Sequence, residues 1–133
     1  MTLEIRFQEI TSDKRVFTEP DELEFYSKDA GLTPPIRPRC VVIPESVEEI
    51  LKIVSVANET NTPLVPVSSG APHFNGSTVP GAGGATVVDL MGMNKVVRID
   101  PKNKVAMIEP GVTFGQLTKE LKKENLAPYK PLA

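Results

Sequence analysis

One part of this chain points most directly to ligand binding. It is a run of small residues that begins where an apolar segment ends. Val65-Pro66-Val67 is apolar, whereas the residues from Ser68 to Gly76 are mostly small or polar. Small side chains let peptide N–H groups approach a ligand closely, and consecutive N–H groups of a tight loop can bind a phosphate without Arg or Lys. The same residue types also gather in ordinary surface turns. The run therefore predicts either a phosphate-binding loop or a surface loop.

Three residues, one of them inside this run, carry side chains that could take part in chemistry. His73 is the only histidine and Cys40 the only cysteine, so an internal disulfide and a Cys-based metal cluster are both excluded within the chain. A lone histidine is also a weak candidate for metal ligation. We interpret Asp89, at the end of an apolar segment, as a carboxylate that caps a turn rather than as a catalytic acid. The sequence thus identifies no catalytic residue and no metal site.

Composition limits the class of protein. The chain has 133 residues, 40% of them hydrophobic and 24% charged, which is enough for one folded domain or part of one. With 15 basic and 17 acidic residues its formal net charge is -2, so it lacks the basic surface that nucleic acids require. No apolar run approaches the ~20 residues of a membrane span, and the first residues do not form a signal peptide. We therefore expect a cytoplasmic protein without a transmembrane segment, and self-association into a homo-oligomer stays open.

The elements that must position the small-residue run form a strand, a helix and a second strand. Cys40-Val41-Val42-Ile43 predicts a short buried strand, and the residues 63–67 predict another. Between them, Ser46 and Glu49 form a capping box that opens a helix, in which apolar residues follow at helical spacing: Val47, Ile50, Leu51, Val54 and Ala57. This order predicts two parallel strands, with the small-residue run leaving the carboxyl end of the second, where ligands commonly bind.

The rest of the chain predicts short elements separated by firm stops. Before Pro38, one short helix is expected from Thr18 and Pro20 through Tyr26. Residues 86–90 predict a strand, and residues 94–99 and 104–109 predict an antiparallel hairpin, joined by a type I turn at Asp100-Pro101. Thr113 and Gln116 form a second capping box before a last helix. The expected fold class is α+β, with a small parallel β-α-β unit plus antiparallel strands and flanking helices.

Four segments in this order resemble the FAD-binding domain of the vanillyl-alcohol oxidase and para-cresol methylhydroxylase flavoproteins, in the branch of glycolate oxidase catalytic subunits and D-lactate dehydrogenases. They are residues 44–50, 65–76, 88–95 and 99–112. The segment Glu24-Phe25-Tyr26-Ser27-Lys28-Asp29 also looks like the stretch that precedes the first strand in that family. The resemblance implies that residues 1–38 are an N-terminal helical and extended segment and that residues 39–133 are the first lobe of a PCMH-type FAD-binding domain. The second lobe and a cap domain would then lie elsewhere, in the same or an adjacent chain.

The resemblance also implies a cofactor and its contacts. In that family the segment after the second strand surrounds the FAD pyrophosphate with backbone N–H groups, which implies this role for Pro66, Val67, Ser68, Ser69, Gly70, Ala71, His73, Asn75 and Gly76. Close relatives carry an Arg and several glycines where this chain has Val67-Ser68-Ser69-Gly70, so the two serine hydroxyls are expected to donate to phosphate oxygens instead. Pro110, Gly111 and Val112 match a segment near the adenine end of FAD, and a plain strand-to-helix turn is the alternative for them.

His73 raises the question of covalent flavin attachment, which some members of the family have. In those members the linking histidine directly follows the glycines, whereas here Ala71 and Pro72 intervene. A hydrogen-bonding or exposed histidine is therefore the favoured interpretation.

The implied function is the FAD-binding portion of a flavin-dependent oxidoreductase that oxidises a 2-hydroxy acid such as glycolate or D-lactate. The chain alone lacks the catalytic groups and is expected to be inactive. One alternative is a non-catalytic binding or assembly module that docks on a separately encoded flavoprotein chain. A phosphate- or nucleotide-binding module unrelated to flavin is a third.

Overall fold

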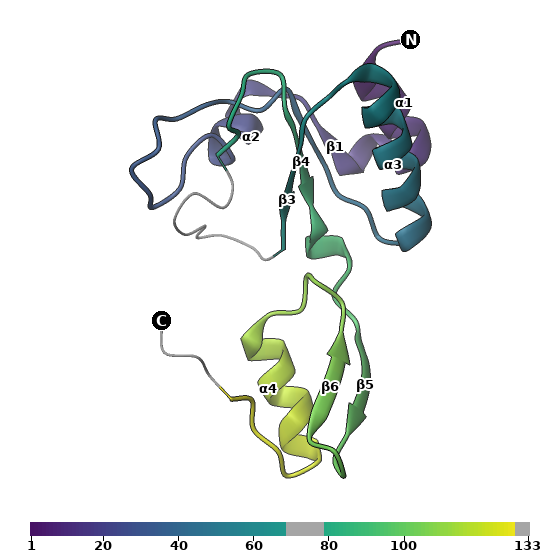
Figure 1. Ribbon diagram of the computed structural model, residues 1–133, viewed down its shortest axis with the longest axis vertical. Helices are drawn as coiled ribbons and strands as arrows, with labels where there is room; N and C mark the ends of the chain where they lie inside the picture. The colour runs from purple at the N-terminus through teal and green to yellow at the C-terminus, as the bar shows by residue number, and fades with distance from the viewer. Residues whose placement is uncertain (69–78, 130–133) are drawn as a thin grey trace.

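The chain is arranged as two unequal units that join through a single short turn (Figure 1). A computed structural model describes residues 1–68 and 79–129. The larger unit is built around a four-stranded sheet, and the smaller one consists of a two-stranded hairpin and a helix. Within the described residues, no helix has the length and apolar content that crossing a membrane requires.

The four-stranded sheet has the order β1-β2-β4-β3. Its strands are β1 (Val16–Phe17), β2 (Cys40–Val42), β3 (Leu64–Val67) and β4 (Thr86–Asp89). β4 lies between β2 and β3 and is parallel to both, whereas β1 is antiparallel to β2. The predicted parallel relationship of the two strands that flank the central helix is therefore confirmed, although the chain places a third strand between them.

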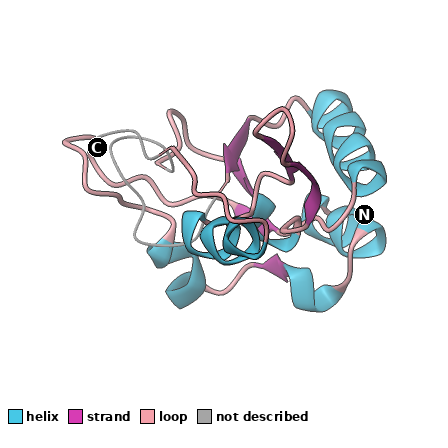
Figure 2. Ribbon diagram, turned by 90° about the horizontal axis from the view of Figure 1, so that it is seen from below, coloured by secondary structure: helices cyan, strands magenta, loops and turns pink. Residues whose placement is uncertain are grey.

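The two faces of this sheet are covered by different helices. Because side chains alternate along a strand, Val42 and Val88 face one way and Val41 and Val87 the other. The first face packs against α1 (Leu3–Ile10) and α3 (Val47–Thr60), which lie side by side near the N-terminus (Figure 2). The second face packs against Leu23 and Tyr26, from α2 (Pro20–Phe25) and the residue after it. These two layers form the core of the larger unit.

Three short elements near the N-terminus were not expected from the sequence. α1 buries Leu3 and Phe7 in the core, with the partly buried Ile10 packed beside them, and β1 is two residues long. Leu3, Phe7 and Ile10 follow helical spacing, but this pattern is short, and a two-residue strand shows no alternation at all. α1, the two-residue β1 and the single-turn η1 (Asp13–Arg15) are nevertheless held to the sheet, since Val16 pairs with Val42 and α1 packs on α3.

The buried face of α3 differs from the apolar spacing read in the sequence. Ile53, Val56 and Ala57 are buried, whereas Val47 and Leu51 are 63% and 65% exposed. The helix carries apolar residues on more than one side, and the sheet together with α1 covers only one of them. Spacing therefore predicted the helix correctly but not the side on which it packs.

The smaller unit confirms the predicted hairpin. β5 (Val96–Asp100) and β6 (Val105–Ile108) are antiparallel, with a bulge between Val96 and Arg98. In the turn, the Asp100 carboxylate accepts hydrogen bonds from the backbone N–H and the side-chain amide of Asn103, at 3.0 and 2.8 Å. α4 (Phe114–Lys123) follows and packs on β5. All four residues of β6 are exposed, so the hairpin is covered on one side at most.

The turn that joins the two units is η2 (Leu90–Gly92). Gly92 inside the turn and Gly111 outside it allow close backbone contacts there. A Cβ placed on Gly92 would lie 2.7 Å from the carbonyl oxygen of Pro44, at the end of β2. A Cβ on Gly111 would collide with the carbonyl oxygen of Leu90. The turn is thus packed between the larger unit on one side and the start of the last helix on the other.

Candidate functional site at the carboxyl edge of the parallel strands

The predicted ligand-binding run leaves the larger unit at the edge where the parallel strands end. β3 ends at Val67 and β4 at Asp89, and these two residues lie directly opposite each other in the sheet. Pro66 and Ser68 are exposed, while Val67 is buried against the second face. Carboxyl ends of parallel strands are the usual place for ligands in α/β sheets. Pro66, Val67 and Ser68 are therefore placed where the sequence expected a ligand.

The other residues of the predicted loop cannot be placed in the same way. Ser69, Gly70, Ala71, His73, Asn75 and Gly76 lie outside the described residues. Their assigned contacts with a pyrophosphate stay predictions, as does the interpretation of His73.

Asp89 forms two hydrogen bonds at this edge, both inside the protein. Its Oδ1 accepts from the backbone N–H of Met91 at 2.9 Å, and its Oδ2 accepts from the phenol hydroxyl of Tyr26 at 2.8 Å. The two side chains are buried, with residues 1% and 6% exposed. The first contact confirms that Asp89 caps a turn. Burial, and next the hydrogen bond to Asp89, raise the pKa of the Tyr26 phenol, so its hydroxyl keeps the proton that it donates.

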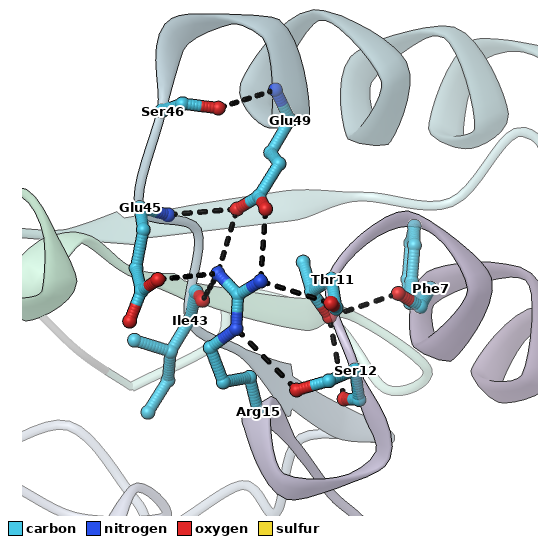
Figure 3. A network of polar contacts seen from close by, with 8 residues as sticks. All are labelled: Phe7, Thr11, Ser12, Arg15, Ile43, Glu45, Ser46 and Glu49. Carbon is cyan, nitrogen blue, oxygen red and sulfur yellow. Dashed lines mark hydrogen bonds and ion pairs between the residues drawn. The ribbon is translucent and has the colours of Figure 1, made fainter.

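A second polar cluster lies at the carboxyl end of β2 and is centred on Arg15 (Figure 3). Both terminal nitrogens of the guanidinium bind the Glu49 carboxylate, at 2.8 Å each, and Nη2 also donates to the carbonyl of Thr11. Glu49 further accepts from the backbone N–H of Glu45 at 2.8 Å. The capping box predicted here is thus half formed: Ser46 accepts from the N–H of Glu49, but the Glu49 side chain turns to Arg15 and Glu45.

The Pro110-Gly111-Val112 segment is a strand-to-helix turn whose amides are already bonded. The N–H of Gly111 donates to the carbonyl of Met93 at 2.8 Å, and that of Val112 donates to Glu109 at 3.1 Å. Pro110 has no N–H. Gly111 is needed here because the backbone of η2 lies against it. A contact between this turn and FAD would therefore use carbonyl oxygens or packing surface, not N–H groups.

Sequence reasoning missed the contribution of two residues to this edge. Tyr26 and Arg15 lie in the N-terminal segment, 63 and 34 residues from their partners Asp89 and Glu49. For Tyr26 a signal existed, because it belongs to the segment that resembles the stretch before the first strand of the family. No local pattern singles out Arg15.

Two described side chains, those of Ser68 and Asp89, bear on what this edge could bind. Ser68 offers an exposed hydroxyl at the end of β3. Asp89, the acidic residue at the ends of β3 and β4, has both oxygens bonded to donors within the protein, which reduces its repulsion of an approaching anion. The described part of this edge is therefore compatible with an anionic ligand.

Comparison with known proteins decides the family. Residues 38–133 match the FAD binding domain family. The chain belongs to this family. FAD is accordingly its cofactor, and the expected mixed fold agrees with that of solved members. The chain is similar to a crystal structure of p-cresol methylhydroxylase with substrate bound, with a TM-score of 0.84 and 32% sequence identity, and the match covers 93% of this chain and 24% of that one.

Two curated relatives show the range of enzymes that share this domain. The chain is 33% identical over 126 residues to the flavoprotein subunit of 4-cresol dehydrogenase [hydroxylating] from Pseudomonas putida. This alignment covers 91% of this chain and 24% of that protein. It is 31% identical over 101 residues to glycolate oxidase subunit GlcD from Bacillus subtilis, covering 76% of this chain and 21% of that protein. The chain therefore spans about a quarter of the length of the curated relatives that it matches.

Proposed function

We propose that residues 1–133 form the FAD-binding part of a flavin-dependent oxidoreductase, with the main chain of residues 67–76 holding the FAD diphosphate. The observation that carries this proposal is the position of the small-residue run, which leaves the carboxyl end of β3 beside the buried Asp89 in a chain of the FAD binding domain family. In this arrangement, the first lobe is formed by residues 39–133, with residues 1–38 packed on it. The second lobe and a cap domain belong to further polypeptide.

For the substrate we propose a 2-hydroxy acid such as glycolate or D-lactate. The support is the similarity to glycolate oxidase subunit GlcD. A phenol is the second candidate, supported by the similarity to the 4-cresol dehydrogenase flavoprotein subunit. When bound, FAD would supply the acceptor for a hydride from the substrate carbon. The base that removes the hydroxyl proton, and the groups that orient the substrate, would come from polypeptide beyond these residues.

The exposed hairpin supports association with further polypeptide. Val97, Val105 and Met107 are each more than half exposed, and a two-stranded hairpin has little stability by itself. A groove of about 290 Å³ between β6, α4 and the segment after α4 is lined mainly by apolar side chains, among them Val105, Phe114, Leu117 and Leu121. A remaining lobe in the same chain would cover this surface. A separately encoded flavoprotein chain would cover it as well, which is why the assembly module stays the second candidate function.

Gly70→Val tests the proposed cofactor site in the natural full-length polypeptide. A branched side chain would move the phosphate away from its N–H donors, so we expect FAD retention to fall by more than about tenfold. Gly83→Val is the matched control, because nothing lies within 4 Å of a Cβ at that position. Bound flavin per polypeptide is measured by absorbance after gel filtration. Equal flavin content in Gly70→Val and the parent would refute the assignment of this run to the diphosphate.

Activity with glycolate, D-lactate and 4-cresol, followed by reduction of the flavin, separates the two substrate classes. Flavin reduced by a 2-hydroxy acid and not by 4-cresol supports the first proposal, and the reverse result supports the second. If the parent takes up flavin only after a second, separately expressed chain is added, the assembly module is the better description.

A further inference from the structure

We propose that Tyr26 and Asp89 act as a positioning pair that holds the carboxyl ends of β3 and β4 in the geometry needed to bind FAD. This inference rests on the proposed function, because it assigns the role of two residues that lie beneath the same site. Neither residue is expected to touch the cofactor. Their effect would pass through Val67 and Ser68, where the chain leaves the sheet.

The pair connects three segments of the chain at one point. Tyr26 follows α2 in the N-terminal segment, and its hydroxyl donates to Asp89 Oδ2 at 2.8 Å. Asp89 Oδ1 accepts from the N–H of Met91, which sets the first turn after β4. Asp89 also lies opposite Val67 in the parallel register, and Val67 packs in the same apolar cluster as Tyr26. Tyr26 is therefore linked to the ends of both strands, to β4 by its hydroxyl and to β3 through the apolar cluster that it shares with Val67.

Loss of the Tyr26 hydroxyl would act on this edge in particular. Asp89 is 1% exposed, so Oδ2 would be left buried without that donor. A buried carboxylate oxygen without a partner is strongly unfavourable, and the residue relieves this cost by moving toward water. Because Asp89 is bonded to the η2 turn and pairs with β3, such a movement would shift Met91 and Val67 with it. The expected consequence is a misplaced exit of the chain at Ser68.

The same strand provides a matched control at its other end. Thr86, the first residue of β4, is completely buried, and its hydroxyl lies 3.3 Å from the Cys40 sulfur. Thr86 pairs with Cys40 and Leu64 at the amino ends of the strands, opposite to the edge where Ser68 lies. Thr86→Val thus removes a buried hydroxyl from β4 without touching the carboxyl edge.

The experiment compares Tyr26→Phe with Thr86→Val in the natural full-length polypeptide. The dissociation constant for FAD is measured by flavin fluorescence on protein freed of flavin, and the melting temperature of that flavin-free protein is recorded. We expect Tyr26→Phe to raise the dissociation constant about tenfold, in line with one lost hydrogen bond to a charged group. Thr86→Val is expected to lower the melting temperature but to leave the dissociation constant within about twofold of the parent. A dissociation constant for Tyr26→Phe within that same range would overturn the inference. A parent that binds no FAD would instead refute the proposed function itself.

Two substitutions of Asp89 give an independent test should Tyr26→Phe fail to fold. In Asp89→Asn, the amide oxygen can accept from Met91 and the NH2 group can donate to the Tyr26 oxygen, so the connection persists with reversed polarity. Asp89→Ala removes both bonds. We expect Asp89→Asn to keep FAD affinity within about threefold of the parent, and Asp89→Ala to lose about tenfold or more. Equal losses in the two variants would show that the hydrogen bonds of Asp89 do not position the site.

Discussion

Arg15 and Glu49 form a bidentate ion pair, with two nitrogen–oxygen distances of 2.8 Å across 34 residues of sequence. The side chains are 20% and 18% exposed, so water screens the pair only partly. The pair fastens the segment before β1 to the first turn of α3, and so fixes the N-terminal segment on the sheet (Figure 3). Planar two-point contacts of this kind are among the stronger polar interactions in proteins.

We expect Glu49→Gln to lower the free energy of unfolding by about 1–3 kcal/mol, because the charged contacts to Arg15 are lost from a largely buried position. Urea denaturation followed by circular dichroism measures the change. Glu48→Gln is the matched control, since Glu48 is an exposed residue of the same helical turn. Equal destabilisation by both substitutions would mean that the ion pair with Arg15 adds nothing measurable to the free energy of unfolding.

Stability should also depend on pH through this pair. The hydrogen bond from Arg15 lowers the pKa of Glu49, and that from Arg39 lowers the pKa of Glu4. The two ionised carboxylates therefore raise the free energy of unfolding at pH values above their ordinary pKa. This contribution is lost as the pH falls through the lowered pKa values. We expect the melting temperature to fall as pH is lowered from about 5 to about 3. The fall should be smaller in Glu49→Gln, and an unchanged slope in that variant would contradict the assignment.

Gly111→Ala should destabilise the junction between the two units. A Cβ at Gly111 would collide with the Leu90 carbonyl oxygen and would lie 2.8 Å from that of Met93, so the backbone must move. The expected loss is about 1–3 kcal/mol, typical of overpacking. Gly115→Ala is the control: its Cβ would lie 3.9 Å from Thr113 Oγ1, and alanine favours the helix by about 0.5–1 kcal/mol. Thermal unfolding of both variants should therefore shift in opposite directions, and a stable Gly111→Ala variant would refute the close packing at η2.

Cys40 should be inert toward thiol reagents while the protein is folded. Burial raises the pKa of its thiol to about 11, and the residue is 0% exposed. Because only the thiolate reacts, modification at about pH 8 should be at least about a hundredfold slower in the native protein than in urea. The reaction with a chromogenic disulfide gives both rates. Rapid modification without denaturant would show that the first face of the sheet opens readily.

Local features of the fold could be predicted from sequence because a few neighbouring residues encode them. Ser46 and Thr113 each accept a hydrogen bond from the residue three positions later, as the capping pattern indicates. Asp100 forms the expected turn contacts between β5 and β6. Likewise, the strand that precedes the small-residue run was predicted correctly, since β3 ends at Val67. Capping and turn formation depend on side chains that reach only their own backbone.

The sequence by itself determined the helices and strands of the central region, the hairpin and the exit of the candidate loop from β3. Only the tertiary structure decided that β4 lies between β2 and β3, that α3 buries Ile53 rather than Leu51, and that Gly111 accommodates η2. It also decided that Tyr26 reaches Asp89. These features depend on contacts between residues that are far apart in sequence, and such contacts are selected by which surfaces together bury the most apolar area and satisfy the most buried polar atoms.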